Sequence, residues 1–231
     1  MDRISVAKDL IDFLYENYKK NIYQSFRKKG QSPKKIMKNV EWFYKDSLFM
    51  DSQIDYYTSG DSYSCILEAC EEWEECQDRI EYDNISAGAE QIVFVYEDEV
   101  IKISSQKMDI VNDYINDKPK EYQKFFCQLT LLDTYRDCNI YTQEKVDINR
   151  MYDEGEKLKE YYNVFDEMES YEICEYCGIL IWNALGRSNK EYENFIEKMH
   201  SCFSGLDCHS NNCGVGADGI PKIFDPVYLG R

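Results

Sequence analysis

Proline, glycine and long apolar runs are all scarce in this chain of 231 residues. With only 4 Pro and 11 Gly, the sequence favours helices with some sheet over a turn-rich β-sandwich. Its longest strongly apolar stretch, CGILIWNAL, is far shorter than a membrane span. The first residues, MDRISVAKDL, carry charges where a secretory signal needs an apolar core. We therefore expect no membrane partner and a cytoplasmic location, in which the ten cysteines are reduced thiols.

Basic side chains are also scarce beyond the first fifty residues. The chain has 27 Lys and Arg against 44 Asp and Glu, a formal net charge of −17. Residues 1–50 hold 11 of these basic residues and 6 of the acidic ones, so the remainder is strongly acidic. An acidic body repels nucleic acid unless it imitates it, which makes nucleic acid an unexpected partner. The basic segment could contact an acidic partner or pack against its own protein.

The sequence does contain enough apolar material for a packed core, with 43% hydrophobic and 15% aromatic residues. Apolar residues at helical spacing predict an amphipathic helix over 4–28, a second over 33–50 and an acidic third over 64–79. These predictions together define a helical N-terminal region, residues 1–83.

The periodicity changes after this region. Residues 91–104, QIVFVYEDEVIKIS, predict a β-hairpin that turns at Glu97–Glu99. The sequence then predicts helix over 107–125 with a break at Pro119, strands over 125–132 and 139–146, helix over 151–203, a loop over 205–219 and a strand over 221–225. This order predicts an α+β fold.

Two residues of the predicted hairpin have chemistry that suits a nucleotide, and so does a glycine just before it. Gly88 lets the backbone approach a ligand closely, and Val93 would present an apolar face to a base. Lys102 alternates with apolar neighbours on the returning strand, so it is a candidate ligand for phosphate. The alternative is that Lys102 is an ordinary strand-edge residue that serves solubility.

Oxygen-bearing side chains gather near the end of the sequence. Asp207 and Asn212 bracket a short loop, and Asp225 ends an apolar strand. Carboxylate and amide oxygens are hard ligands that suit Mg²⁺. Alternatively, Asp207 and Asn212 could cap a turn, and Asp225 could be an ordinary strand end.

Cysteines and one histidine suggest a different metal. Cys174 and Cys177, taken with Cys208, His209 and Cys213, have the ligand types of a structural zinc site. The first pair lies in a helical pattern, however, where two thiols three residues apart occur by chance in a cysteine-rich chain. The pattern therefore favours ordinary cysteines over zinc.

The order of these motifs resembles the protein-kinase-like superfamily. Its pattern is a glycine-rich loop, a strand lysine, an Asp-x-x-x-x-Asn catalytic loop and a metal-binding aspartate. Asp207 to Asn212 keeps the catalytic spacing, and the Asp-x-His-x-x-Asn and Asp-Pro-Val variants look like those of small atypical kinases, including phage-encoded protein kinases and sugar or aminoglycoside kinases. The resemblance covers residues 84–231. It implies a two-lobed kinase-like fold, with an N-lobe-like sheet over 84–146, C-lobe-like helices and catalytic loops over 147–231, and the N-terminal helices as an addition.

The resemblance also implies ATP and Mg²⁺ as cofactors and gives each motif residue a role. Asp207 would accept or orient the proton of the acceptor hydroxyl. Asn212 and Asp225 would hold Mg²⁺, and Lys102 would hold the ATP phosphates. The remaining residues that the resemblance places at the nucleotide are Gly88, Val93, Glu121 as an ion-pair partner of Lys102, and Glu144 and Val146 in the hinge strand.

The sequence departs from the family pattern at several points. Ser86 and Gln91 stand where the outer glycines of the loop are expected, the residues before Asp207 are Ser-Gly-Leu, and Pro226 follows Asp225. The sequence given ends where an activation segment would begin, so we expect a truncated C-lobe that lacks this segment.

The predicted function is an ATP- and Mg-dependent phosphotransferase, in the host cytoplasm if phage-encoded, that acts on Ser or Thr of a protein. Two alternatives remain: a small-molecule kinase, and a degenerate kinase-fold protein that binds and sequesters a host partner. The sequence does not determine the oligomeric state.

Overall fold

The computed structural model confirms the mixed α+β class predicted from the sequence. It describes residues 2–18, 64–78, 80–87, 91–104, 107–162, 175–185 and 210–226. The chain divides into two compact units, Met1–Lys107 with Thr130–Gln143, and Met108–Leu129 with Glu144–Arg231. This division differs from our boundary at residue 83, since the described N-terminal helices belong to the same unit as the larger sheet. None of the helices in the described ranges is both long and apolar enough to cross a bilayer.

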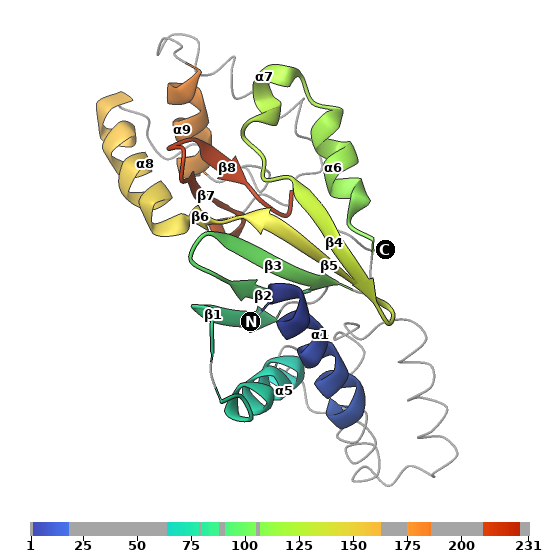
Figure 1. Cartoon of the computed structure of the whole chain (residues 1–231). Coiled ribbons are helices and arrows are strands. Elements are labelled where there is room, and N and C mark those ends of the chain that lie inside the picture. Colours follow the sequence, from blue (N-terminus) through green and yellow to red (C-terminus); the bar gives the residue numbers. More distant parts are fainter. Residues whose placement is uncertain are drawn as a thin grey trace, which may run out of the picture. The chain divides into compact units, whose positions relative to one another are not determined.

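The first unit contains a five-stranded sheet in the order β1-β2-β3-β5-β4 (Figure 1). The predicted hairpin is confirmed, and Val95 lies opposite Val100 where its two strands meet the turn. The strand before it was not predicted, because four residues without strong alternation give little sequence signal. The bounds are β1 (Asn84–Ala87), β2 (Ile92–Val95), β3 (Glu99–Ser104), β4 (Leu129–Tyr135) and β5 (Cys138–Glu144).

Two helices of the N-terminal region pack on one face of this sheet and share its hydrophobic core. These are α1 (Arg3–Phe13), which continues as a π-helical turn over Leu14–Tyr18, and α5 (Ser64–Glu75). The predicted helix over 64–79 is confirmed, and that over 4–28 is confirmed as far as residue 18. The predicted helix over 33–50 lies outside the described residues.

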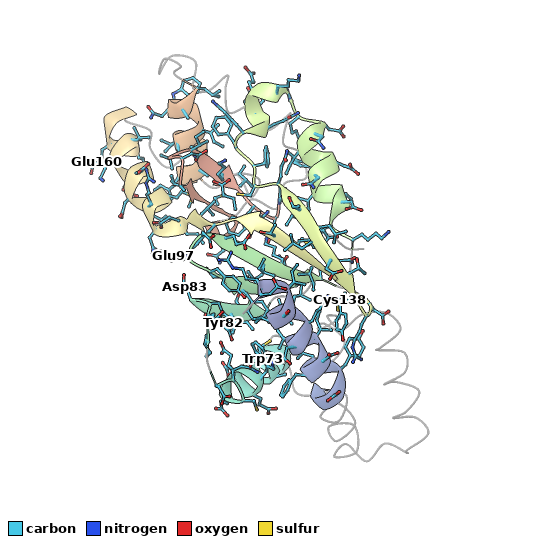
Figure 2. The ribbon with its side chains drawn as sticks, viewed as in Figure 1. Trp73, Tyr82, Asp83, Glu97, Cys138 and Glu160 are labelled. Atoms are coloured by element: carbon cyan, nitrogen blue, oxygen red, sulfur yellow. The ribbon has the colours of Figure 1, made fainter. Side chains whose placement is uncertain are left out.

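Aromatic rings form the centre of this core (Figure 2). Trp73 of α5 stacks on Tyr82 with ring centroids 6.3 Å apart, and Phe94 of β2 meets both rings edge-on at 5.9 and 4.9 Å. Trp73 is 2% exposed, and its indole N–H donates to Asp9 of α1 at 2.9 Å. The core therefore joins α1, α5 and the sheet into one packed body.

Ion pairs add to this packing along α1. Arg3 contacts Glu99 and, at 2.7 Å, Asp98 in the β2–β3 turn. Near the other end of the helix, Asp12 accepts hydrogen bonds from Arg136 at 2.7 Å and from the Tyr135 hydroxyl at 2.9 Å. Exposed pairs of this kind contribute up to about 1 kcal/mol each, so they set the orientation of α1 while apolar burial supplies the stability.

The second unit contains a three-stranded sheet in the order β6-β7-β8 and four helices among its described residues. The strands are short: β6 (Val146–Asp147), β7 (Cys213–Gly216) and β8 (Pro221–Ile223). The helices are α6 (Asp109–Asn116), α7 (Lys120–Gln123), α8 (Ile148–Tyr162) and α9 (Glu175–Ala184). The predicted break at Pro119 is confirmed, because this residue is the N-cap of α7.

One loop prediction and one strand prediction need correction in this part of the chain. The loop predicted over 205–219 contains strand β7, which pairs with β8 on one side and β6 on the other. The strand predicted over 125–132 begins only at Leu129, since Phe126 instead forms an isolated parallel bridge with Ile223. Both corrections involve pairing with residues that are distant in sequence, a signal that local patterns do not carry.

Candidate functional site

Lys102 lies on the face of the larger sheet that is opposite the helix-covered core. Its neighbours Ile101 and Ile103 belong to that core, and side chains alternate between the two faces of a strand. Val93 of β2 is directly opposite Lys102 in the register, so the two predicted nucleotide residues share one face. Lys102 is only 2% exposed, in a strand with neighbours on both sides. It is therefore no strand-edge solubility residue, which removes the alternative reading.

The face that carries Lys102 holds further buried polar side chains. Ser104 of β3 and Asn139 and Gln143 of β5 are 0%, 9% and 3% exposed. Ser104 follows the core residue Ile103, Asn139 lies between the core residues Cys138 and Ile140, and Gln143 shares the face of Asn139 by alternation along β5. The core face, by contrast, is aliphatic and aromatic. Burial of polar and charged groups costs free energy unless they are compensated, so this polar face is not the product of simple core packing. This buried polar face carries two of the predicted nucleotide residues, Lys102 and Val93.

In the second unit, Asn212 and Asp225 are brought side by side by the β7–β8 hairpin. Cys213 pairs with Ile223, which sets Asn212 just before one strand and Asp225 just after the other. The backbone N–H of Phe224 donates to the Asn212 carbonyl at 2.9 Å. The Asn212 side-chain amide donates to the Asp225 carbonyl at 3.5 Å. Two potential Mg²⁺ ligands are thus held at the same end of one hairpin, and their role as metal ligands stays a prediction.

The backbone of Asp225 has a conformation that few residues adopt. Its φ is 53°, which lies in the left-handed region where Asp and Asn are favoured among residues with a side chain. This residue follows β8 by two positions, after Phe224 has made the last backbone hydrogen bond of the hairpin, to Asn212. Asp225 is therefore fixed by the hairpin bonds and by its own local geometry, and its side chain remains partly exposed.

One of the two predicted hinge residues, Val146, lies in the small sheet whose β7–β8 hairpin Asn212 and Asp225 flank, whereas Glu144 is the last residue of β5. Val146 of β6 pairs with Gly216 of β7, and its side chain also packs over Gly214, where an added Cβ would meet Val146 Cγ2 at 2.7 Å. Gly216 is three residue steps, roughly 10 Å, along β7 from the Asn212 end. The described residues therefore join the predicted base-binding segment and the predicted metal-binding residues in one sheet.

One cluster near the hairpin turn was missed by the sequence reasoning. Lys222 of β8 has its ammonium 3.1 Å from the Glu144 carboxylate and 3.4 Å from that of Asp218. Burial by itself would lower the pKa of Lys222, but hydrogen bonding to Glu144 and Asp218 raises it above the ordinary value. The available signal was a lysine that alternates with apolar residues in PKIF, the same signal that selected Lys102 in VIKI.

Several predicted site residues are not located. Gly88 and Asp207 lie outside the described residues, so their roles stay predictions. Glu121 lies in the first turn of α7, exposed, in the second unit, while Lys102 belongs to the first. Each unit is described by itself, and the Lys102–Glu121 pair therefore also stays a prediction.

Among the cysteines whose side chains the structure describes, all are free thiols, and all except the exposed Cys76 are buried. Cys177 and Cys213 are both free and buried, while the other three residues of the zinc hypothesis lie outside the described ranges. Across those ranges, no three His, Cys, Asp or Glu side chains gather as a metal site. Desolvation, followed by nearby carboxylates, raises the pKa of Cys70 to about 12. Such a thiol stays protonated and unreactive at neutral pH.

Comparison with known proteins finds little similarity to this chain. No protein-family model matches this chain, and no curated protein matches it. Among solved structures, a crystal structure of monomeric WbdD matches with 15% identity and a TM-score of 0.25, over 59% of this chain and 32% of that chain. A co-crystal structure of WbdD with the kinase inhibitor LY294002 matches with 15% identity and a TM-score of 0.26, over 62% and 32%. The match thus spans about a third of WbdD, and the candidate site is defined by its own residues alone.

Proposed function

We propose that this protein is an ATP- and Mg-dependent phosphotransferase with a kinase-like arrangement of its site. The observation that carries the proposal is the pairing of Asn212 and Asp225 at one end of the β7–β8 hairpin. Two oxygen-bearing side chains held next to each other, one anionic, suit a Mg²⁺ ion that keeps its other positions for water and phosphate. This is the requirement of phosphoryl transfer, in which the metal neutralises charge on the transferred group.

Lys102 supports the proposal from the first unit. Its ammonium is buried on the polar face that it shares with Val93. In the proposed site Lys102 binds the phosphates and Val93 contacts the base. Since phosphoryl transfer depends mainly on positioning and charge neutralisation, these residues and the metal ligands account for most of the chemistry. Asp207 would orient the acceptor hydroxyl.

The segment that contains Glu144 and Val146 supplies the remaining part of the proposed site. Its backbone would bind the adenine edge, and β6 and β7 set its distance from the metal ligands. Backbone N–H and C=O groups can form hydrogen bonds with the base without placing a charge beside it, which suits a neutral base. The base and the metal-bound phosphates would then occupy opposite ends of β7.

The test combines nucleotide binding with phosphoryl transfer. Wild-type protein should gain thermal stability with Mg-ATP by RT ln(1 + [L]/Kd), about 2.7 kcal/mol at a hundredfold excess over Kd. It should also label an acceptor from radiolabelled ATP, in a cell extract or in itself. Asp225→Asn should lose most of this labelling but keep its fold, because asparagine tolerates the left-handed backbone of this position.

Matched variants make this test specific. Asp153→Asn makes the same change at an exposed site on α8 and should label normally. Lys102→Met should abolish labelling, since an apolar side chain of similar length replaces the buried ammonium, and circular dichroism checks that the variant is folded. Equal labelling by Asp225→Asn, Asp153→Asn and wild type would refute the site assignment.

The acceptor we propose is a Ser or Thr hydroxyl of a protein, with a small-molecule hydroxyl as the alternative. Fractionating the extract by size separates the two, because label on a protein stays in the high-mass fraction. Label found only at low mass would replace the first proposal with the second.

A second function has its own support in the sequence. The glycine-poor loop, with Ser86 and Gln91 at its outer positions, and the strongly acidic body both suit a non-catalytic protein that binds and sequesters a partner. Such a protein would show no thermal shift at millimolar Mg-ATP, or a shift without any transfer of label. The same two assays therefore separate the two functions.

A further inference from the structure

The buried lysine of β8 connects three segments of the second unit. Lys222 lies between Glu144, the last residue of β5, and Asp218 in the β7–β8 turn. Its side chain is 11% exposed, whereas those of the two carboxylates are 36% and 45% exposed. The ammonium is therefore the inner member of the cluster, and the two anions screen it from water.

The cluster is packed closely against the backbone beneath it. A Cβ added to Gly216 would lie 2.5 Å from Glu144 Oε1, 2.8 Å from Asp218 Oδ1 and 3.2 Å from Lys222 Cε. All three side chains thus converge on the one residue of β7 that pairs with Val146. Asp218 is further held by the backbone N–H of Ile220, which donates to its carboxylate at 3.0 Å.

An arrangement of this kind is better suited to fixing geometry than to adding stability. Withdrawing an ammonium from water costs free energy that carboxylate partners only partly return, and apolar side chains in place of the whole ion pair are often at least as stabilising, whereas removal of one partner alone is destabilising. An ion pair differs from an apolar contact in being directional, because it fixes which carboxylate lies where. Here the carboxylate that is fixed belongs to the segment leading into β6.

We propose that Lys222 is a positioning residue, which acts through Glu144 to anchor the segment 144–147 on the β7–β8 hairpin. The inference rests on the proposed function in one respect: the anchored segment is the one whose backbone would bind the base. With the anchor in place, the base-binding backbone keeps a fixed distance from Asn212 and Asp225. Lys222 touches neither the base nor the transferred phosphate in this proposal.

The expected effect is on nucleotide affinity and on local motion. Without the ammonium, the backbone of 144–147 should separate from β7 more often, and its amides should exchange with solvent roughly tenfold faster or more. The KM for ATP should rise by a similar factor, because the protein must first restore the bound conformation. The kcat at saturating ATP should stay near the wild-type value, since the metal ligands are unchanged.

The experiment compares three variants of the full chain. Lys222→Met removes the ammonium, Lys222→Arg restores a cation that can reach the same carboxylates, and Lys157→Met makes the matched change at an exposed site on α8. Hydrogen exchange of residues 144–147 is measured without nucleotide, and KM and kcat are measured with Mg-ATP. Faster exchange and a higher KM in Lys222→Met alone, with recovery in Lys222→Arg, would support the proposal.

The remaining outcomes separate this inference from the proposed function. Unchanged exchange of 144–147 in Lys222→Met would overturn the anchor, whatever the kinetics. Faster exchange with an unchanged KM would overturn the role in positioning the base. Faster exchange in a protein whose wild type binds no Mg-ATP would support the anchor and refute the proposed function. A fall in kcat together with a fall in folded fraction would identify a merely structural residue and overturn the proposal.

Discussion

Gly214 of β7 offers a direct test of how closely β6 and β7 pack. An alanine there would place its Cβ 2.7 Å from Val146 Cγ2, 2.9 Å from Val146 Cβ and 3.1 Å from the Asp147 carbonyl carbon. Two of these distances are shorter than real Cβ atoms show. Valine is stiff about χ1, and the third atom belongs to the backbone. The overlap with the alanine Cβ can therefore be relieved only if β6 moves away from β7.

The size of the effect follows from two opposing terms. Overpacking of this kind costs about 1–3 kcal/mol. Replacing glycine restricts the unfolded chain and returns about 0.4–1 kcal/mol. We therefore expect Gly214→Ala to lower the free energy of unfolding by about 1–2 kcal/mol. The displaced β6 should also weaken Mg-ATP binding, since it carries the proposed base-binding backbone.

Gly216→Ala is the matched control in the same strand. Its closest contacts would be the ends of the Glu144, Asp218 and Lys222 side chains, which are flexible and can shift together with their ion pairs intact. Urea unfolding should therefore show a loss of less than about 1 kcal/mol in this variant. Adding Val146→Ala should recover at least about 0.5 kcal/mol in the Gly214 variant and nothing in the Gly216 variant. Equal stability of the two glycine variants, or no recovery with Val146→Ala, would refute the packing argument.

Other substitutions test the two cores and the acid response. Trp73→Ala should destabilise the first unit by about 3–5 kcal/mol in urea unfolding, because it removes a buried ring and the donor to Asp9; a loss below 1 kcal/mol would show that the ring is dispensable. Gly155→Ala should destabilise the second unit despite a gain of about 1 kcal/mol in helix propensity, since its Cβ would lie 2.8 Å from Tyr176 Cβ; higher stability would show that α8 and α9 can separate freely. Burial raises the pKa of Asp218, but the Ile220 N–H and the Lys222 ammonium lower it below its ordinary value of 3.8. The contribution of Asp218 to the free energy of unfolding is therefore present above that pH and is lost as the pH falls. Asp218→Asn should therefore flatten the stability profile of the protein below about pH 4, and parallel profiles would contradict this pKa shift.

The elements that could be predicted from the sequence are those whose signal is local. Two apolar runs around an acidic turn indicate the β2–β3 hairpin, and apolar residues at helical spacing indicate α5. The break before α7 follows from proline chemistry at residue 119. Each of these signals lies within fewer than twenty residues of sequence, so no knowledge of distant partners is needed.

The elements that could not be predicted depend on partners that are far away in sequence. Strand β7 reads CGVG, which suits a loop as well as a strand, and it becomes a strand because β6 and β8 pair with its two edges. Phe126 finds its partner in Ile223, nearly a hundred residues later. Pairing of this kind is decided by tertiary packing, and intrinsic strand preference contributes little to it.

The candidate site likewise combines residues that a local sequence pattern indicates with contacts that depend on distant partners. Asn212 and Asp225 could be selected from the sequence as oxygen-bearing candidates, but their adjacency depends on the β7–β8 hairpin, whose first strand was predicted as loop. The burial of Lys102 was one of two alternatives, and the structure decides for it. The Lys222 cluster could not be predicted, since Glu144 lies 78 residues before Lys222 and nothing in the sequence connects them.

The two buried lysines show where sequence reasoning and structure have to be combined. Lys102 and Lys222 occupy equivalent patterns, each alone between apolar residues in a short strand. In a chain of net charge −17, any lysine finds carboxylates nearby, so opposite charge alone does not explain why these two are buried. Burial costs each ammonium its hydration, and that cost is tolerated only where the charge has a use. For Lys222 the geometry supplies the use, because its ammonium contacts Asp218 of the hairpin and Glu144 of the neighbouring segment. In the proposed site Lys102 binds the phosphates, so Lys102→Met and Lys222→Met should differ: the first should lose transfer itself, and the second only affinity.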